Sequence, residues 1–191
     1  MNNKINIFIS AMVAGILIGI GVIINTALTI PVLGALLFSF GLLTVIELKV
    51  PLYTGKIGYA FNGQKDLLTI FLGNVMGIIV CIEFQMCGNL DSLQRMTSVA
   101  ASKFSKTAFE MFFCGIMCGM LIHFAVRAKQ FYTTIMAIMI FILIGGEHCI
   151  ADVPYLITVM SLDNIFKFIC VVLGNSIGAI ALEEMLRVNN V

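Results

Sequence analysis

Apolar stretches separated by short polar segments run through almost the whole chain. Six of them fall at about 5–28, 30–48, 67–87, 107–126, 130–145 and 165–186. A helix needs about 20 apolar residues to cross the hydrocarbon core of a bilayer, and each stretch reaches or approaches that length. The pattern therefore predicts an all-α membrane protein with six transmembrane helices. The longest polar segment, 88–106, is expected to lie outside the bilayer.

Composition and charge narrow the possibilities. Of the 191 residues, 60% are hydrophobic and 11% are charged, so a water-soluble fold would lack polar surface to cover itself. We expect 1–191 to form a single transmembrane domain, because six spans leave little room for another. A net charge of +1 without a basic patch argues against nucleic acid as a partner. The six cysteines form no CxxC pair, so no metal site, disulfide framework or cofactor is expected.

The basic residues indicate an orientation. With the N-terminus inside, the inner segments hold Lys4, Lys49, Lys56, Lys65, Arg127, Lys129 and Arg187, and the outer ones hold Arg95, Lys103, Lys106 and Lys167. Cytoplasmic loops carry an excess of Lys and Arg, so this distribution modestly favours cytoplasmic termini. We expect a multi-pass protein of the cell (inner) membrane.

Two motifs of small residues recur after about 100 positions. Gly15-xxx-Gly19 recurs as Gly115-xxx-Gly119, and Gly73-Asn74-xx-Gly77 recurs as Gly174-Asn175-xx-Gly178. This pairing predicts two repeats, about 1–95 and 96–191, with three helices each. Because three is odd, the repeats must be inverted in the membrane, which is typical of channels and transporters. Each glycine by itself needs no role beyond close helix contact.

Two segments interrupt the spanning pattern, in the second and the fifth helix. Each contains an acid followed by a proline: Glu47 and Pro51 in 47–56, and Glu147 and Pro154 in 145–154. Proline breaks a helix, and irregular backbone survives at membrane depth only beside protein or a water-filled cavity. The N-termini of half-helices also favour anions. We therefore expect a permeation site at these two breaks.

His148 is the leading site candidate, because an ionisable residue within a membrane span is costly and usually functional. Glu147 precedes it, and Asp152 follows one turn later. Thr54, in the first break, offers a hydroxyl, although it is as readily explained as a helix cap. His123, in the fourth helix, is expected to form an interhelical hydrogen bond.

In their order and spacing these residues resemble the formate/nitrite transporter family over nearly the whole chain. The stretch 147–151 resembles the fifth-helix motif, whose histidine is the central pore residue. The stretch 52–54 resembles the loop that interrupts the second helix, and 38–42 resembles the segment before it. The glycine–asparagine pairs resemble the motifs of the third and sixth helices: Gly73 and Asn74, and Gly174 and Asn175.

The resemblance implies an aquaporin-like fold and a homopentamer with one pore in each protomer. Four residues would form apolar constrictions above and below His148: Phe38, Leu42, Leu52 and Phe141. Lys103 matches a vestibule lysine, and Glu110 would counter its charge. Two positions depart from the family pattern, since Gly119 and Asp152 replace asparagines. A carboxylate at 152 is expected to favour the protonated imidazole of His148.

These features predict a channel or transporter for small monovalent anions such as formate, nitrite or hydrosulfide. A bare anion in an apolar constriction costs tens of kcal/mol, so we expect passage as the protonated species or with a proton. Lys103 would attract the anion, and the proton would come from His148 or from water through it.

Two other functions remain open from the residues alone. A divalent metal-ion carrier would use Glu147, His148, Cys149 and Asp152. An intramembrane enzyme would use His148 and Asp152 with Cys149 or Cys118, but the sequence lacks GxSxG-like and HExxH motifs. We therefore do not expect an enzyme.

Overall fold

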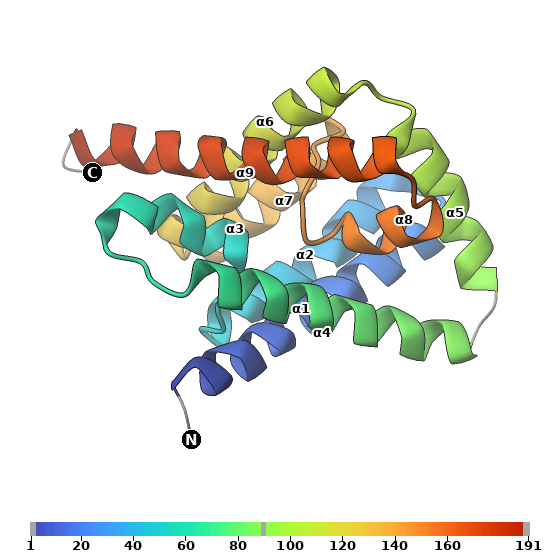
Figure 1. The fold of residues 1–191 in the computed structure, drawn as a ribbon, viewed down its shortest axis with the longest axis horizontal. Coiled ribbons are helices and arrows are strands. Elements are labelled where there is room, and N and C mark those ends of the chain that lie inside the picture. Colours follow the sequence, from blue (N-terminus) through green and yellow to red (C-terminus); the bar gives the residue numbers. More distant parts are fainter. Residues whose placement is uncertain (1–2, 89–90, 189–191) are drawn as a thin grey trace.

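The computed structural model describes residues 3–88 and 91–188, and within these ranges it contains helices and connecting turns but no strands (Figure 1). The helices are α1 (Asn3–Ala27), α2 (Pro31–Glu47), α3 (Tyr53–Lys56), the 3-10 helix η1 (Ile57–Asn62), α4 (Leu67–Gly88), α5 (Asp91–Phe104), α6 (Ala108–Ala128), α7 (Phe131–Leu143), α8 (Val153–Thr158) and α9 (Leu162–Val188). The predicted all-α class is confirmed.

Four helices, α1, α4, α6 and α9, are long and apolar enough to cross a membrane, whereas α2 and α7 are apolar but shorter. Large apolar side chains such as Phe84, Leu162 and Phe109 are mostly exposed, which suits a surface that faces lipid rather than water. The shorter helices, α2 and α7, are those in which the sequence predicted a break. Each ends inside the molecule instead of crossing it as one continuous helix.

Both predicted breaks are present. After α2 the backbone turns at Lys49, whose φ is 57°, and resumes as α3 and η1. After α7 it turns at Gly145, whose φ is 75°, and runs without regular helix to α8. A positive φ is easily reached by glycine and is uncommon for lysine.

Two asparagines hold the breaks in matching ways. In the first half, the Asn74 amide accepts from the Tyr53 N–H at 2.8 Å and donates to the Pro51 carbonyl at 3.0 Å. In the second half, the Asn175 amide accepts from the Cys149 N–H and donates to the Glu147 carbonyl, both at 2.8 Å. Leu52 and His148 are therefore the counterparts at the centre of each clamp.

This pairing corrects the alignment of the repeats drawn from sequence. The structural counterpart of Glu147 is Pro51, not Glu47, and Glu47 is exposed whereas Glu147 is fully buried. Gly15 of α1, rather than Gly19, is the structural counterpart of Gly119 of α6. Gly15 lies against the main chain of Asn74, and Gly119 lies against the main chain of Asn175. The sequence motif was therefore misaligned by one helical turn. The repeat boundaries remain a prediction.

The two halves run in opposite directions. Asn25, near the end of α1, shares a cavity with Lys106, which lies two residues before the start of α6. Lys49, at the end of α2, shares a second cavity with Lys129, at the end of α6. Thus α1 ends where α6 begins, as inverted repeats require.

The polar segment after α4 is not a simple loop. It forms α5, which lies at the edge of the molecule between α4 and α6 (Figure 1). Met96, Ala100 and Phe104 are spaced four residues apart, and all three are buried on one face of this helix. The sequence analysis missed α5 because its helical period is carried by few apolar residues.

The predicted role of His123 is confirmed. Its Nε2 lies 2.9 Å from the Glu183 carboxylate, and Arg127 donates to both oxygens of the same carboxylate at 3.0 Å. These bonds join α6 to α9. Gly58 of η1 lies directly against the imidazole of His123, which fixes the end of the first break to the same pair of helices.

Candidate functional site

The two breaks bring His148 and Thr54 together. His148 Nε2 lies 2.9 Å from Thr54 Oγ1, although 94 positions separate the two residues. Thr54 stands in the first turn of α3, just after the clamp made by Asn74, and His148 stands inside the clamp made by Asn175. Both side chains are buried. The predicted cap role for Thr54 is not seen, because the residue at the N-cap of α3 is Leu52.

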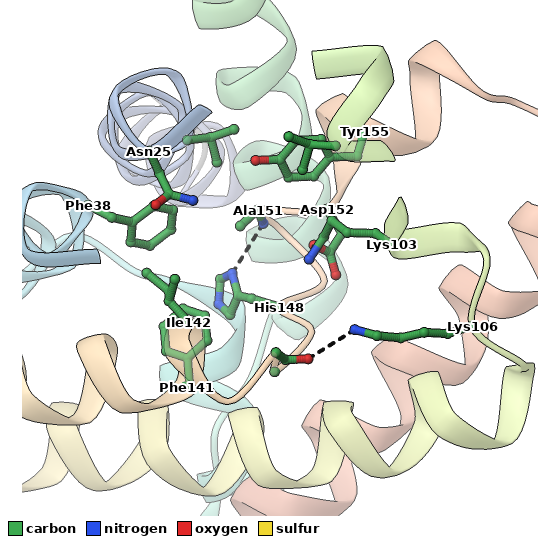
Figure 2. Close-up of a pocket in the computed structure, with 14 residues that line it drawn as sticks. Asn25, Phe38, Lys103, Lys106, Phe141, Ile142, His148, Ala151, Asp152 and Tyr155 are labelled. Atoms are coloured by element: carbon green, nitrogen blue, oxygen red, sulfur yellow. Dashed lines mark hydrogen bonds and ion pairs between the residues drawn. The ribbon is translucent and has the colours of Figure 1, made fainter. Parts of the chain in front are cut away.

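The hydrogen bonds of the imidazole define its protonation state. The Ala151 N–H donates to His148 Nδ1 at 3.1 Å, as Figure 2 shows, so Nδ1 acts as an acceptor and carries no proton. The proton of the neutral ring then lies on Nε2, which donates to Thr54 Oγ1. A second ring proton would point at the Ala151 N–H, so this arrangement belongs to the neutral imidazole.

One cavity of about 220 Å³ opens beside the histidine (Figure 2). Its walls come from α1, α2, α5, the turn after α5, α7, the second break and α8. They include Asn25, Phe38, Lys103, Lys106, Phe141, His148, Asp152 and Tyr155. The ring of His148 lies between the two phenylalanines and the Ala151 backbone (Figure 2). The cavity thus joins charged groups on one side to aromatic rings on the other.

The charges around this cavity are balanced. Lys103 Nζ lies 2.5 Å from the Glu147 carboxylate and 3.2 Å from Asp152. Lys106 Nζ lies 2.5 Å from the other Glu147 oxygen and donates to the Gly145 carbonyl at 3.1 Å. Burial favours the neutral amine of Lys103, but Asp152 and Glu147 outweigh it, and the pKa of Lys103 lies above its ordinary value. Two basic side chains therefore face two acidic ones.

Two predictions about this charge cluster are wrong. Glu110 does not counter Lys103; it forms a capping box with Thr107 at the start of α6, on a different helix from Lys103. Asp152 does not charge the imidazole either, because its Oδ1 contacts Lys103 while Nδ1 of the ring accepts from the backbone. The sequence could not show that a turn separates α5 from α6.

A second cavity of about 280 Å³ lies at the other end of the broken helices. It is lined by Val45, Ile46, Lys49, Val50, Leu52, Gly55, Lys56, Val126 and Lys129. Its polar side chains are thus three lysines, and its floor is apolar. No residue is common to the linings of the two cavities.

The four predicted constriction residues are buried between these cavities. Phe38 and Phe141 meet edge to face at 6.0 Å on the side of the first cavity, and Leu52 lines the second. Leu42 lies one turn beyond Phe38 on α2 and is 1% exposed. An apolar layer therefore separates the cavities, and the His148–Thr54 pair lies within it.

The remaining predicted residues support the site without lining it. Glu147 is fully buried in its two ion pairs, and Asn74 and Asn175 hold the backbone. Gly73 and Gly174 lie against the main chains of α1 and α6. Gly119 lies against the main chain of Asn175, which agrees with the close helix contact expected of the small-residue motif.

Among the lining residues that the sequence analysis missed as site candidates, three have polar side chains: Lys106, Tyr155 and Asn25. Lys106 could have been identified from the sequence, because it follows the candidate Lys103 by three residues. Tyr155 donates to or accepts from Thr26 at 2.9 Å, and its ring lies 5.4 Å from the Lys103 ammonium. Such contacts between distant segments cannot be read from local sequence.

The residues suggested for a metal carrier do not form a metal site. Within residues 3–88 and 91–188, no group of three His, Cys, Asp or Glu side chains lies close enough to hold a metal ion. Glu147 and Asp152 are instead neutralised by lysines.

Comparison with known proteins agrees with this architecture. A family model described as formate/nitrite transporter matches residues 2–188. The nitrite transporter NirC of Escherichia coli (strain K12) is 27% identical over 180 aligned residues, covering 79% of this chain and 67% of that protein, and the NirC of Shigella flexneri matches equally. Among solved structures, a pentameric formate channel with formate bound has a TM-score of 0.82 at 21% identity, covering 98% of this chain and 97% of that one. An FNT family ion channel has a TM-score of 0.83 at 22% identity, covering 100% and 92%.

Proposed function

The chain belongs to the formate/nitrite transporter family and is a multi-pass membrane channel or transporter rather than an enzyme; from this premise we propose that it passes small monovalent anions between its two cavities as their protonated forms. The observation that carries the proposal is the arrangement of the two cavities. They are separated by a buried apolar layer that contains one hydrogen-bonded polar pair, His148 and Thr54.

Magnitudes favour the neutral species. A carboxylic acid with a pKa near 4 costs about 4 kcal/mol to protonate at pH 7, at 1.36 kcal/mol per pH unit. Moving the bare carboxylate into an apolar layer costs tens of kcal/mol by Born estimates, and still several after relaxation. Protonation is therefore the cheaper route past Phe38, Leu42, Leu52 and Phe141. Formate, nitrite and hydrosulfide all fit this scheme.

In the proposed pathway, His148 and Thr54 form the site at which the substrate is hydrogen-bonded. In the neutral ring, Nε2–H donates to Thr54 Oγ1, which leaves the hydroxyl proton of Thr54 free to donate to a substrate oxygen. Because Nδ1 is occupied by the Ala151 N–H, the proton that neutralises the anion comes from water in the first cavity rather than from Nδ1. The anion gains that proton on entering and releases it in the opposite cavity.

Assembly and orientation follow the same premise. One similar structure is a pentameric formate channel, and we propose the same assembly here, with one pore per protomer. Both described chain ends lie on the side of the three-lysine cavity, since α1 begins and α9 ends there. The excess of basic residues on that side supports a cytoplasmic location for it in the inner membrane of a cell.

The test is flux through reconstituted liposomes with His148→Gln, which keeps a donor of similar length but cannot titrate. Wild type is expected to carry formate with a rate that rises as the pH falls, because the neutral fraction grows about tenfold per unit above the pKa of the acid. The variant is expected to lose most of this flux. A variant with unchanged rate and pH dependence would remove His148 from the pathway. Protein-free liposomes give the background of direct acid permeation.

A further inference from the structure

Three lysines converge on the second cavity from separate parts of the chain. Lys49 follows α2, Lys56 ends α3, and Lys129 is the C-cap of α6. Lys49 and Lys129 both have left-handed backbones, with φ of 57° and 51°. This conformation is uncommon for a residue with a side chain, and here it occurs at two of the three cationic positions of one cavity.

The charge balance of this cavity differs from that of the first. Around the first cavity, Lys103 and Lys106 are paired with Glu147 and Asp152. The second cavity has no carboxylate in its lining, and no ion pair joins its lysines to any acid within the described part of the chain. Three positive charges around one concave, partly apolar site produce a local potential that attracts anions.

We propose that the three-lysine cavity binds a divalent oxyanion of the sulfate or phosphate type, which then blocks the pore. The blocking part rests on the proposed function, whereas the binding part does not. Three ammonium groups supply donors for several oxygens of a tetrahedral anion. One water molecule occupies roughly 30 Å³ of liquid. A cavity of about 280 Å³ therefore has room for a tetrahedral anion together with part of its hydration shell.

Such an anion cannot follow a monovalent one through the apolar layer. By the Born relation the cost of burying an ion rises with the square of its charge, so at equal radius a dianion costs about four times as much as a monovalent ion. It also needs two protons to become neutral. Leu52 forms the floor of the cavity at the entrance to the layer, and a bound dianion there stands in the path of the substrate.

Flux and binding can be tested in separate measurements. Formate flux is measured in oriented liposomes of uncharged lipid with sulfate on one side only, against chloride at equal ionic strength. Sulfate on the lysine side is expected to block flux in the millimolar range and to have little effect from the other side. For each protein, the flux with sulfate is divided by the flux with chloride, so a difference in basal rate between variants does not affect the result.

Single substitutions assign the block to the cavity. Lys49→Gln, Lys56→Gln and Lys129→Gln are each expected to raise the half-blocking sulfate concentration about three- to tenfold. Lys65→Gln is the matched control, because Lys65 lies in the loop before α4 on the same side but does not line the cavity. Equal block from both sides, or equal sensitivity of all four variants, would overturn the assignment.

Binding is followed without transport, as the rise in melting temperature of the detergent-solubilised protein with sulfate and with phosphate. A rise in wild type that is reduced in Lys56→Gln supports the site; no rise overturns it. Flux without any block refutes the inference but leaves the proposed function standing, whereas absence of formate flux refutes the proposed function alone. A block that requires anionic lipid and not the free anion would assign the lysines to a headgroup and overturn the proposal.

Discussion

Asp152→Asn tests the charge balance of the first cavity. Asp152 is 1% exposed, and Oδ1 of its carboxylate lies 3.2 Å from Lys103 Nζ. Asparagine has nearly the same shape and keeps an oxygen for Lys103, so the break is expected to fold unchanged. Glu147 still pairs with Lys103 in the variant. The change therefore removes one acid from a cluster of two lysines and two acids, and the net charge of the cluster becomes more positive by up to one unit.

The expected gain follows from Coulomb's law. One added positive charge attracts a monovalent anion about 4 Å away by about 1 kcal/mol in water, which is close to a fivefold rise in its local concentration. Salt reduces this gain, because the Debye length falls from about 10 Å at 0.1 M to about 3 Å at 1 M. We predict an initial rate of formate entry from the side of the first cavity that is about fivefold higher at low salt and nearly normal at 1 M.

The assay is stopped-flow formate uptake in liposomes at two ionic strengths, with Asp163→Asn as the matched control. Asp163 lies at the same end of the molecule, is exposed, and pairs with Lys167 one turn along α9. It does not line the cavity. A rate in Asp152→Asn equal to or below wild type at low salt would refute the reasoning, as would a gain that persists unchanged at high salt.

Three further substitutions test the site and its supports. Thr54→Val removes the acceptor of the His148 Nε2–H and is expected to lower formate flux about five- to 150-fold, from the 1–3 kcal/mol cost of an unpaired buried donor. Thr134→Val is the control, since the buried hydroxyl of Thr134 makes no hydrogen bond within the described chain. Gly58→Ala places a methyl group against the ring of His123 and is expected to cost about 1–3 kcal/mol of stability, seen as a lower melting temperature. Gly119→Asn is expected to abolish the monodisperse peak in size-exclusion chromatography, because the new side chain would overlap the main chain of Asn175. A folded, active variant would contradict this contact.

The sequence predicted the structure best where the local residues alone determine whether a helix forms or ends. Runs of apolar residues placed the spanning helices to within a few positions, and the proline at 51 and the glycine at 145 marked the breaks. His148 and Thr54 were both identified as site candidates from their positions in the two breaks, and the structure brings their side chains into contact. In these cases local chemistry and tertiary structure agree.

The sequence was misleading where tertiary contacts decide the outcome. The resemblance of Glu47 to Glu147 was accidental, since the asparagine clamps set the true register. The partner of Lys103 depended on a turn between α5 and α6 that apolar periodicity does not mark. The orientation of the imidazole depended on the Ala151 N–H, which is available only because the break leaves it outside a regular helix.

The most direct test of the central claim is the number of protons that accompany each anion. Formate uptake into liposomes and internal pH are recorded together at zero membrane potential, with a protein-free control. The account predicts one proton released inside for each formate that enters, without electrical current. A current that reverses at the formate equilibrium potential, with no change in internal pH, would show that the bare ion crosses the apolar layer and would contradict the account.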